Sequence, residues 1–318
     1  RITVLYGSEK DSYRRIAGIH YMKVSVGAIP SRSLRKIYFS LRVRKILQDP
    51  EFANQISLSL GRTGLADIVI AAGNYPGTKR EDIVNSSWFK NPMYYLDKIS
   101  FKECKHIFAA SELVKNELEE LFNISEKRIT VLYPPIKIED YSKVASDRKQ
   151  ELYKRFGMDP NRKNFLFVST GHKRKGLPFL LDIFASLNPD KYVLYVAGNR
   201  FESTLPNVKY LGYVEKTADL YNISDCLLHP ASYEAFGQVI TESLICGLPV
   251  LVSDRVGARE IVNEDNGKIL PYNDKDAWKD AIINFGEKRS FDANWLVKDL
   301  SIEAHVDKML SEWTGYEN

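Results

Sequence analysis

Short runs of β-branched and aromatic residues alternate with stretches of helical periodicity along this chain, and this alternation limits the possible folds more than any other feature. Two such series follow one another, the first within residues 2–135 and the second within residues 165–271. A strand followed by a helix, repeated several times, is typical of α/β proteins with parallel sheets. We therefore expect two α/β units.

The expected elements can be assigned to residue ranges. Strands are expected at residues 2–7, 20–26, 67–73, 106–111 and 129–135 in the first series, and at 165–170, 192–198, 208–214, 226–230, 249–253 and 267–271 in the second. Helices of the second series are expected at residues 177–187, 217–223, 237–246 and 274–285. The polar stretch 136–164 is interpreted as a linker and the first helix of the second unit.

Length and composition agree with two folded domains. The chain has 318 residues, of which 44% are hydrophobic, enough to bury a substantial core. We find no apolar run of about 18 residues and no signal sequence at the front, so a cytoplasmic protein is expected. Cys104, Cys226 and Cys246 are odd in number and far apart, which argues against a disulfide framework or a zinc site.

Residues 231–254, ASYEAFGQVITESLICGLPVLVSD, carry two acids in a strand, loop and helix unit. The helix is expected to begin near Gly237 and to end at Gly247. In an open parallel sheet, ligands bind beyond the carboxyl ends of the strands, where helix N-termini present free N–H groups. Glu234 in the loop and Glu242 in the helix are therefore placed to hold opposite ends of one ligand.

A carboxylate suits a vicinal diol because its two oxygens accept two O–H donors. We assign Glu242 to the ribose of a nucleotide and Glu234 to hydroxyls of a sugar beyond the diphosphate, with the amides of Phe236 and Gly237 close by. The implied ligand is a nucleotide sugar. The alternative is a surface helix that carries two ordinary acids.

A second motif, STGHKRKG at residues 169–176, follows the first strand of the same unit. A strand, the Gly171 turn, four consecutive basic residues and a second glycine are suited to clamp a diphosphate. The alternative is a solvated basic loop. Together the two motifs would form the two halves of one pocket.

The stretch EAFGQVITESLICGLPVLVSD resembles the E-x7-E signature of the retaining GT-B glycosyltransferases of family four. The resemblance covers residues 107–270, and TGHKRKG with DCLLHPASYEAFG is most similar to the lipopolysaccharide-core glucosyltransferase branch. It rests on Glu234, Phe236, Gly237 and Glu242, on the run CGLPV at 246–250, and on Gly257, Glu260, Ile261 and Val262.

This resemblance implies two Rossmann-like domains facing across a cleft. Residues 1–140 would form the acceptor side, with a first strand and helix missing and with residues 300–318 rejoining it, and residues 141–299 would bind the nucleotide sugar. It implies catalysis with retention and without a metal or other cofactor. The implied catalytic residues are Glu234, Lys175 and Arg174, and the implied donor-binding residues are Glu242, Phe236, Gly237, Gly171 and Lys173. His172 stands where the family commonly has an arginine, so Lys173 or Arg174 must take that role.

The first 50 residues hold eleven Lys and Arg against three Asp and Glu. In residues 32–48, a helical wheel places Leu34, Ile37, Tyr38 and Leu41 on one face and Phe39, Val43, Ile46 and Leu47 on roughly the opposite face. One face can pack on a sheet, and the other can lie on an anionic membrane. The alternative is a helix buried between elements, with its basic side chains extending to solvent.

The function we predict is transfer of a hexose, with retention, from a UDP- or GDP-linked sugar to a glycan or lipid-linked acceptor in lipopolysaccharide or other cell-surface glycan assembly. The enzyme would act in the cytoplasm, at the inner face of the membrane. A sugar-nucleotide epimerase on the same scaffold and an inactive GT-B partner subunit are the alternatives. Nucleic acid is not an expected partner, because aromatic and basic residues are not interleaved.

Overall fold

The computed structural model describes residues 2–7, 16–52, 55–61, 65–74, 76–77, 91–286 and 291–314. The chain forms two compact units, one of Arg1–Ala110 with Val114–Val131 and one of Ser111–Leu113 with Leu132–Asn318. Every strand pairing in the described ranges is parallel, so the predicted α/β class with parallel sheets is confirmed. None of the helices described is both long enough and apolar enough to cross a bilayer.

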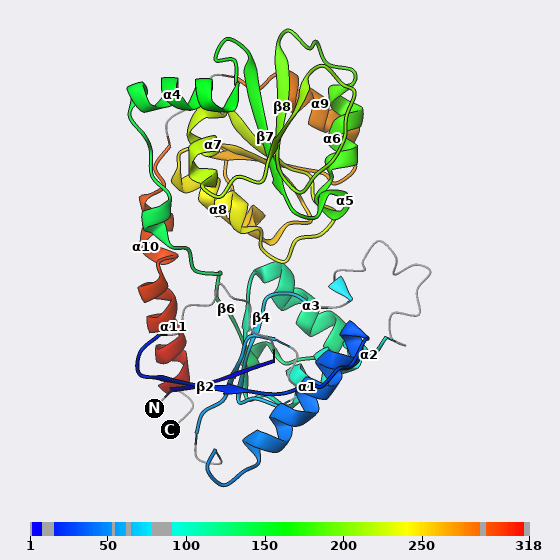
Figure 1. Ribbon diagram of the computed structural model, residues 1–318, viewed down its shortest axis with the longest axis vertical. Helices are drawn as coiled ribbons and strands as arrows, with labels where there is room; N and C mark the ends of the chain where they lie inside the picture. Colours follow the sequence, from blue (N-terminus) through cyan, green and yellow to red (C-terminus); the bar gives the residue numbers. More distant parts are fainter. Residues whose placement is uncertain are drawn as a thin grey trace. The chain divides into compact units, whose positions relative to one another are not determined.

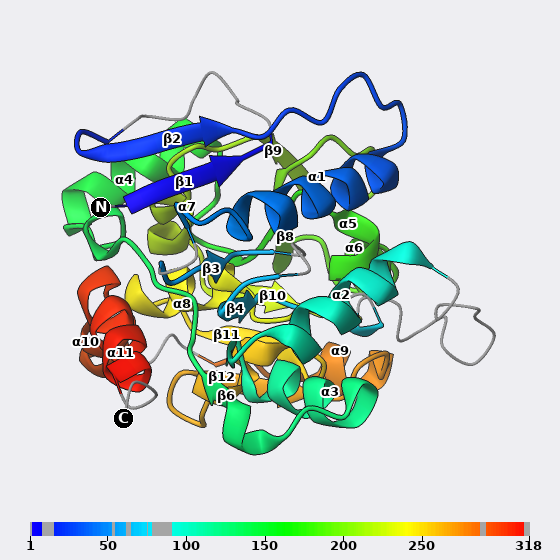
Figure 2. The same cartoon turned by 90° about the horizontal axis from the view of Figure 1, so that it is seen from below.

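The first unit contains two separate sheets (Figures 1 and 2). Among the described strands, β1 (Ile2–Tyr6) and β2 (Ile19–Lys23) pair only with each other, whereas the sequence placed them in one series with the later strands. The four-stranded sheet has the order β3-β4-β5-β6. Its strands are β3 (Leu58–Ser59), β4 (Ile68–Ala71), β5 (His106–Ala109) and β6 (Ile129–Val131), and the helices of this region are α1 (Arg32–Leu47), α2 (Pro92–Glu103) and α3 (Glu112–Phe122).

Helices α1 and α2 begin at side-chain caps that the sequence supplies. The Ser31 hydroxyl accepts a hydrogen bond from the Leu34 N–H, and the Asn91 side chain accepts one from the Met93 N–H. Pro92 occupies the first turn of α2, where its missing N–H costs no hydrogen bond. Both helices therefore have defined starts, and they contact each other.

The second unit is built on a six-stranded sheet with the order β12-β11-β10-β7-β8-β9. Read from β9, this is the 3-2-1-4-5-6 order of doubly wound dinucleotide-binding folds. The order reverses between β7 and β10, so the segments after these two strands meet at the carboxyl edge of the sheet. The strands are β7 (Lys163–Ser169), β8 (Tyr192–Gly198), β9 (Val208–Gly212), β10 (Cys226–His229), β11 (Val250–Ser253) and β12 (Gly267–Leu270).

Helices cover both faces of this sheet (Figure 1). Helices α6 (Leu177–Phe184) and α9 (Lys275–Ile283) lie on one side, where a core with Trp278 and Phe165 fully buried fills the space beneath them. Helices α7 (Thr217–Ile223) and α8 (Gln238–Ile245) lie on the other side, next to α4 (Ser146–Phe156). Burial on both faces explains why the strands read as continuous apolar runs.

The last helices, α10 (Asn294–Asp299) and α11 (Ile302–Thr314), are grouped with the second unit. The sequence instead assigned residues 300–318 to the first domain and put the boundary at residue 140. The segment that begins the second unit is bonded to these helices: the Ile136 N–H donates to the Leu300 carbonyl at 2.9 Å, and a ring nitrogen of His305 lies 3.0 Å from the Tyr133 carbonyl oxygen. These contacts hold the two segments in one unit.

Candidate active site

The basic motif after β7 forms one helical turn, α5 (His172–Lys175), and Gly176 joins it to α6. Gly176 has a φ of +88°, and a Cβ atom there would lie 2.4 Å from the Pro230 carbonyl oxygen. Only glycine fits both the left-handed backbone and this close approach. The glycine thus brings the basic turn against the start of the loop that follows β10.

Backbone contacts fasten that loop to α5 and to the next βα connection. The Ser232 N–H donates to the Arg174 carbonyl at 2.9 Å, and the Arg174 guanidinium donates to the Tyr233 carbonyl. The Glu234 N–H donates to the Arg255 carbonyl at 3.2 Å, and its own carbonyl accepts from Gly257 at 2.9 Å. The backbone of Glu234 is therefore fixed from both sides.

The side chain of Glu234 lies among the basic groups that the sequence predicted to accompany it. Its Oε2 atom is 3.2 Å from Arg174 Nη1 and 3.5 Å from Lys175 Nζ, and the side chain is only 18% exposed. Coulombic attraction is strengthened in such a sheltered place. The structure thus joins the two motifs into one cluster, with one acid facing two cations.

His229, the last residue of β10, is a member of this cluster that the sequence analysis missed. The imidazole is fully buried, and its Nε2 atom lies 3.9 Å from Glu234 Oε2. Burial lowers the His229 pKa to about 3, with help from the positive charges of Lys175 and Arg174. The ring is therefore neutral at pH 7. The available signal was a polar residue at the carboxyl end of an apolar strand.

Glu242, one and a half turns into α8, is held by aromatic hydroxyls. The fully buried Tyr221 donates to Glu242 Oε2 at 2.7 Å. Burial and the nearby Glu242 carboxylate raise the pKa of Tyr141 to about 12 and also raise the pKa of Tyr221. Both tyrosines stay protonated and can donate to the carboxylate. The sequence pattern gave no sign of either partner.

The turn before α8 has the backbone that its glycine predicts. Gly237 has a φ of +105°, and Ile240, Val256 and Glu234 surround the position of its missing Cβ atom. The buried ring of Phe236 stacks on Tyr133, with centroids 5.3 Å apart. Phe236 therefore anchors the turn through its ring, and only its backbone can face a ligand.

The remaining residues of the basic motif have different surroundings. The Gly171 N–H donates to the Ser169 hydroxyl at 3.0 Å, and Lys173 is exposed. A ring nitrogen of His172 lies 2.6 Å from the Asn199 carbonyl oxygen, which ties α5 to the end of β8. Arg174 and Lys175, rather than Lys173, are the basic residues that meet Glu234.

Glu260 lies in the connection after β11, in the segment Gly257–Ile261. Its carboxylate accepts the N–H groups of Glu112 and Leu113 at 3.0 and 3.1 Å. A Cβ atom on Gly257 would lie 2.1 Å from the Ala235 carbonyl oxygen, so glycine is required for this connection to pack against the loop. In the described ranges, no three His, Cys, Asp or Glu side chains gather as a metal site would require.

Comparison with solved structures defines the class of fold. WaaG, a glycosyltransferase involved in lipopolysaccharide biosynthesis, matches with a TM-score of 0.71 and 18% identity over 85% of this chain and 78% of WaaG. HepE of Anabaena, solved with UDP, matches with a TM-score of 0.67 and 15% identity over 93% of this chain and 86% of HepE. The fold is the GT-B fold of glycosyltransferases.

Sequence comparison adds a more particular similarity. Residues 148–296, which lie in the second unit, match the family described as glycosyl transferases group 1. A probable transglycosylase of Burkholderia thailandensis is 28% identical over 76% of this chain and 65% of its own length. The O-antigen chain mannosyltransferase RfbU of Salmonella typhimurium is 24% identical over 60% of this chain and 53% of its own length. The chain thus spans half to two thirds of these curated relatives, and the similarities support a glycosyltransferase.

Proposed function

We propose that this chain transfers a hexose, with retention of configuration, from a nucleoside diphosphate sugar to a cell-surface glycan or glycolipid. The observation that carries the proposal is the position of Glu234 between Arg174 and Lys175 at the edge where the strand order of the second unit reverses. Ligands of doubly wound sheets bind at this place. The solved complex of HepE with UDP supports a nucleotide donor.

In the proposed reaction, Arg174 and Lys175 bind the diphosphate. The bond between the anomeric carbon and the β-phosphate oxygen breaks, and its electron pair stays on the phosphate, where the two cations stabilise the new charge. The acceptor hydroxyl attacks the same face of the sugar, and its proton passes to the departing phosphate oxygen. Positioning and charge stabilisation then supply most of the rate acceleration.

Glu234 has a second partner available in this scheme. The diphosphate brings negative charge to the same cations that Glu234 contacts. Once the cations bind phosphate oxygens, the carboxylate is free to accept hydroxyls of the sugar. Neutral His229 lies beneath it and keeps the floor of the site uncharged at pH 7.

Glu242 binds the ribose in this proposal. The Tyr221 hydroxyl fixes one carboxylate oxygen, so the group meets the ribose diol in a set orientation with less conformational entropy to lose. The acceptor is proposed to be lipid-linked, with the basic helix α1 in contact with an anionic membrane surface at the inner face of the membrane. Six of the sixteen residues of α1 are Lys or Arg and none is acidic.

Titration with UDP-glucose and GDP-mannose, followed by NMR of the product formed from the donor that binds, tests the proposal. We expect binding without added metal, slow donor hydrolysis, and an α-linked product from an α-linked donor. Interconversion of the sugar would favour the epimerase, and a failure of both donors to bind would favour the inactive partner subunit.

Substitution of the two acids tests the site itself. Glu242→Ala should lose about 2–4 kcal/mol of transition-state stabilisation, because a sheltered bidentate contact is lost. The loss would be measured as a lower kcat/KM. Glu234→Ala should reduce kcat at least as strongly. Glu264→Ala, an exposed acid of the same unit, is the control. Unchanged kcat/KM in Glu242→Ala would remove Glu242 from the site.

A further inference from the structure

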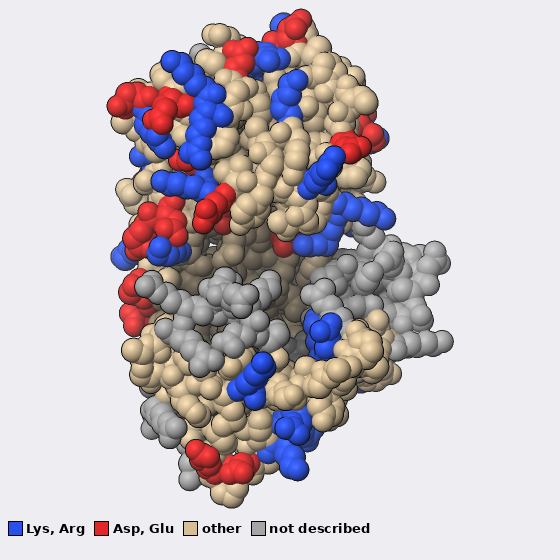
Figure 3. All heavy atoms as spheres, viewed as in Figure 1, with Lys and Arg blue, Asp and Glu red and all other residues tan. Residues whose placement is uncertain are grey.

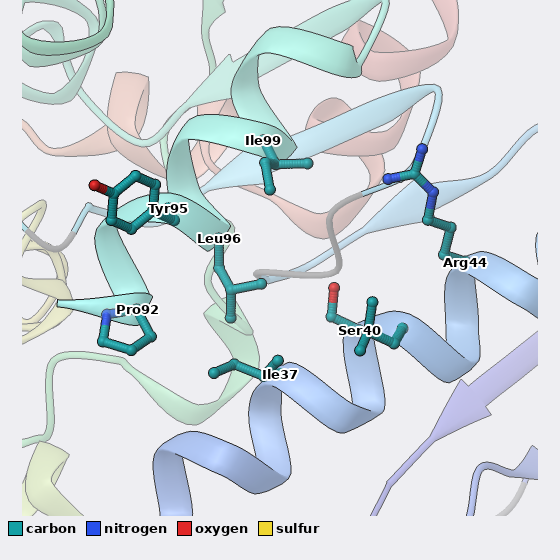
Figure 4. A pocket seen from close by; sticks show the side chains of 8 residues that line it. Ile37, Ser40, Arg44, Pro92, Tyr95, Leu96 and Ile99 are labelled. Carbon is teal, nitrogen blue, oxygen red and sulfur yellow. The ribbon is translucent and has the colours of Figure 1, made fainter. Parts of the chain in front are cut away.

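The first unit contains a groove between α1 and α2 that the proposed donor site does not use (Figure 4). Its volume is about 360 Å³, at the small end of the range for ligand pockets. Side chains from the two helices face each other across it in Figure 4, and Arg44 lies at one end. The lining residues are Ile37, Ser40, Leu41, Arg44, Pro92, Tyr95, Leu96 and Ile99.

Apolar side chains remain exposed along this groove and beside it. Leu41 is 59% exposed and Tyr95 is 50% exposed, and both line the groove. Leu34 and Tyr38 continue the exposed face of α1, while Val43 on its other side is buried. The helix is therefore two-faced, as the sequence indicated, and none of the elements that the structure describes covers its apolar outer face. A contiguous apolar surface of this kind marks a binding site more often than isolated exposed residues do.

The charge around the groove has one predominant sign. Helices α1 and α2 together hold eight Lys and Arg and two Asp and Glu. One of the acids, Asp97, is buried, and the other, Glu103, pairs with Arg44 at 3.7 Å. Lys and Arg side chains lie among residues without acidic or basic side chains on the surface over α1 (Figure 3). A ligand that suits this surface has an apolar body and an anionic head.

We propose that this groove binds one hydrocarbon chain of an anionic, phosphate-bearing amphiphile, with the head group among the basic residues of α1. The apolar lining matches the chain, and Arg44 at the end of the groove, with the excess of Lys and Arg on α1, matches the head. The volume favours a single chain over a partner's helix, whose diameter of about 10–12 Å would require a wider trough. If the proposed function holds, the amphiphile is the lipid-linked acceptor, and the groove selects it by its chain rather than by its sugar.

A tryptophan placed in the groove can report its occupant directly. In Tyr95→Trp, titration with a decyl phosphate brominated at the chain end should quench the added fluorescence in a saturable way. Leu34→Trp places the same reporter on the exposed face of α1 outside the groove, where we expect at most a third of that quenching. Equal quenching at both positions would show adsorption on the helix surface and would overturn the proposal.

Matched leucine substitutions in the Tyr95→Trp background distinguish binding in the groove from nonspecific adsorption to the apolar surface. Leu41→Gln should raise the Kd of the brominated decyl phosphate at least fivefold. Leu34→Gln, at a site of similar exposure, should change that Kd less than twofold. Equal losses of affinity in the two variants would contradict the proposal. So would equal affinity for a decyl trimethylammonium with the same hydrocarbon chain, or displacement of the brominated decyl phosphate by inorganic phosphate alone. Dimers that only Leu41→Gln disrupts would assign the groove to a second copy of the chain instead.

The two proposals can fail independently. Glu242→Ala should weaken donor binding and leave the quenching of Trp at position 95 unchanged, because Glu242 belongs to the other unit. If the protein binds a nucleotide sugar but no amphiphile, only the proposal for the groove is overturned. If the protein binds the amphiphile but neither UDP-glucose nor GDP-mannose, only the proposed function is overturned.

Discussion

In the candidate site of the second unit, charged side chains lie next to a buried neutral one. Glu234 lies between Arg174 and Lys175, while burial keeps the neighbouring His229 ring neutral at pH 7, with help from the positive charges of the same cations. Glu242 lies against the hydroxyl of buried Tyr221. Each acid is thus oriented by a group that the chain supplies from a different element.

Removal of the Tyr221 hydroxyl tests whether it positions Glu242. Tyr221→Phe keeps the ring and leaves one carboxylate oxygen without its donor, at a cost of about 1–1.5 kcal/mol. We expect the Kd for the donor to rise up to about tenfold with little change in the bound-state kcat, measured by calorimetry and steady-state kinetics. Tyr153→Phe, a half-buried tyrosine on α4, is the control. An unchanged Kd in Tyr221→Phe would contradict the positioning role.

The lowered pKa of His229 predicts a pH dependence of stability. The unfolded chain binds a proton at this ring between about pH 6.5 and pH 3, whereas the folded chain does not. The free energy of unfolding should therefore fall with falling pH in this window, by at most about 1.4 kcal/mol per pH unit from this residue. The contribution is fully present above pH 6.5.

Urea denaturation of wild type and His229→Gln at pH 7, 6 and 5 measures this effect. The variant should lose part of the slope of stability against pH, whatever its stability at pH 7. His20→Gln, at an exposed histidine, should keep the wild-type slope. Identical slopes for wild type and His229→Gln would show that the ring is accessible to protons in the folded protein.

At the scale of elements, the site depends on two βα connections that glycines allow to meet. Gly176 lets α5 pack against Pro230, and Gly257 lets the connection after β11 pack against Ala235. These approaches place basic residues from one connection beside the acid of another. The arrangement follows from the switch of strand order between β7 and β10.

Alanine substitutions at Gly176 and Gly171 should separate these roles. Gly176→Ala forces a Cβ atom against a backbone oxygen at a positive φ, so a loss of about 2 kcal/mol or more is expected. Gly171 has an ordinary φ of −137° and open space around it, so Gly171→Ala should keep the wild-type Tm. Similar Tm values for both variants would contradict the importance of the close approach.

At the scale of the whole molecule, one chain forms two compact units. The proposed donor contacts lie in the second unit, and the α1–α2 groove lies in the first. Each unit is therefore expected to respond to its own ligand.

Donor binding should stabilise the second unit selectively. At a free donor concentration of 100 times Kd, mass action adds about 2.7 kcal/mol to the stability of the state that binds. Hydrogen exchange of the strands Lys163–Ser169 and Val250–Ser253 should slow on addition of the donor, while that of His106–Ala109 should stay within a factor of two. Equal slowing in both units would show that the donor is not bound by the second unit alone.

The sequence by itself determined the class of fold and most of the strands and helices of the second unit, because buried parallel strands and capped helices leave apolar runs, glycines and prolines at fixed places. It also predicted that Glu234 would share one region with Arg174 and Lys175, since those residues follow two strands whose ends meet, and the three side chains do lie together. Tertiary structure alone decided that Tyr221 and Tyr141 flank Glu242, that His229 is buried beneath Glu234, that β1 and β2 form a separate sheet, and that α11 belongs with the second unit. These contacts join residues far apart in the chain, and periodicity records only which face of an element is buried, not what buries it.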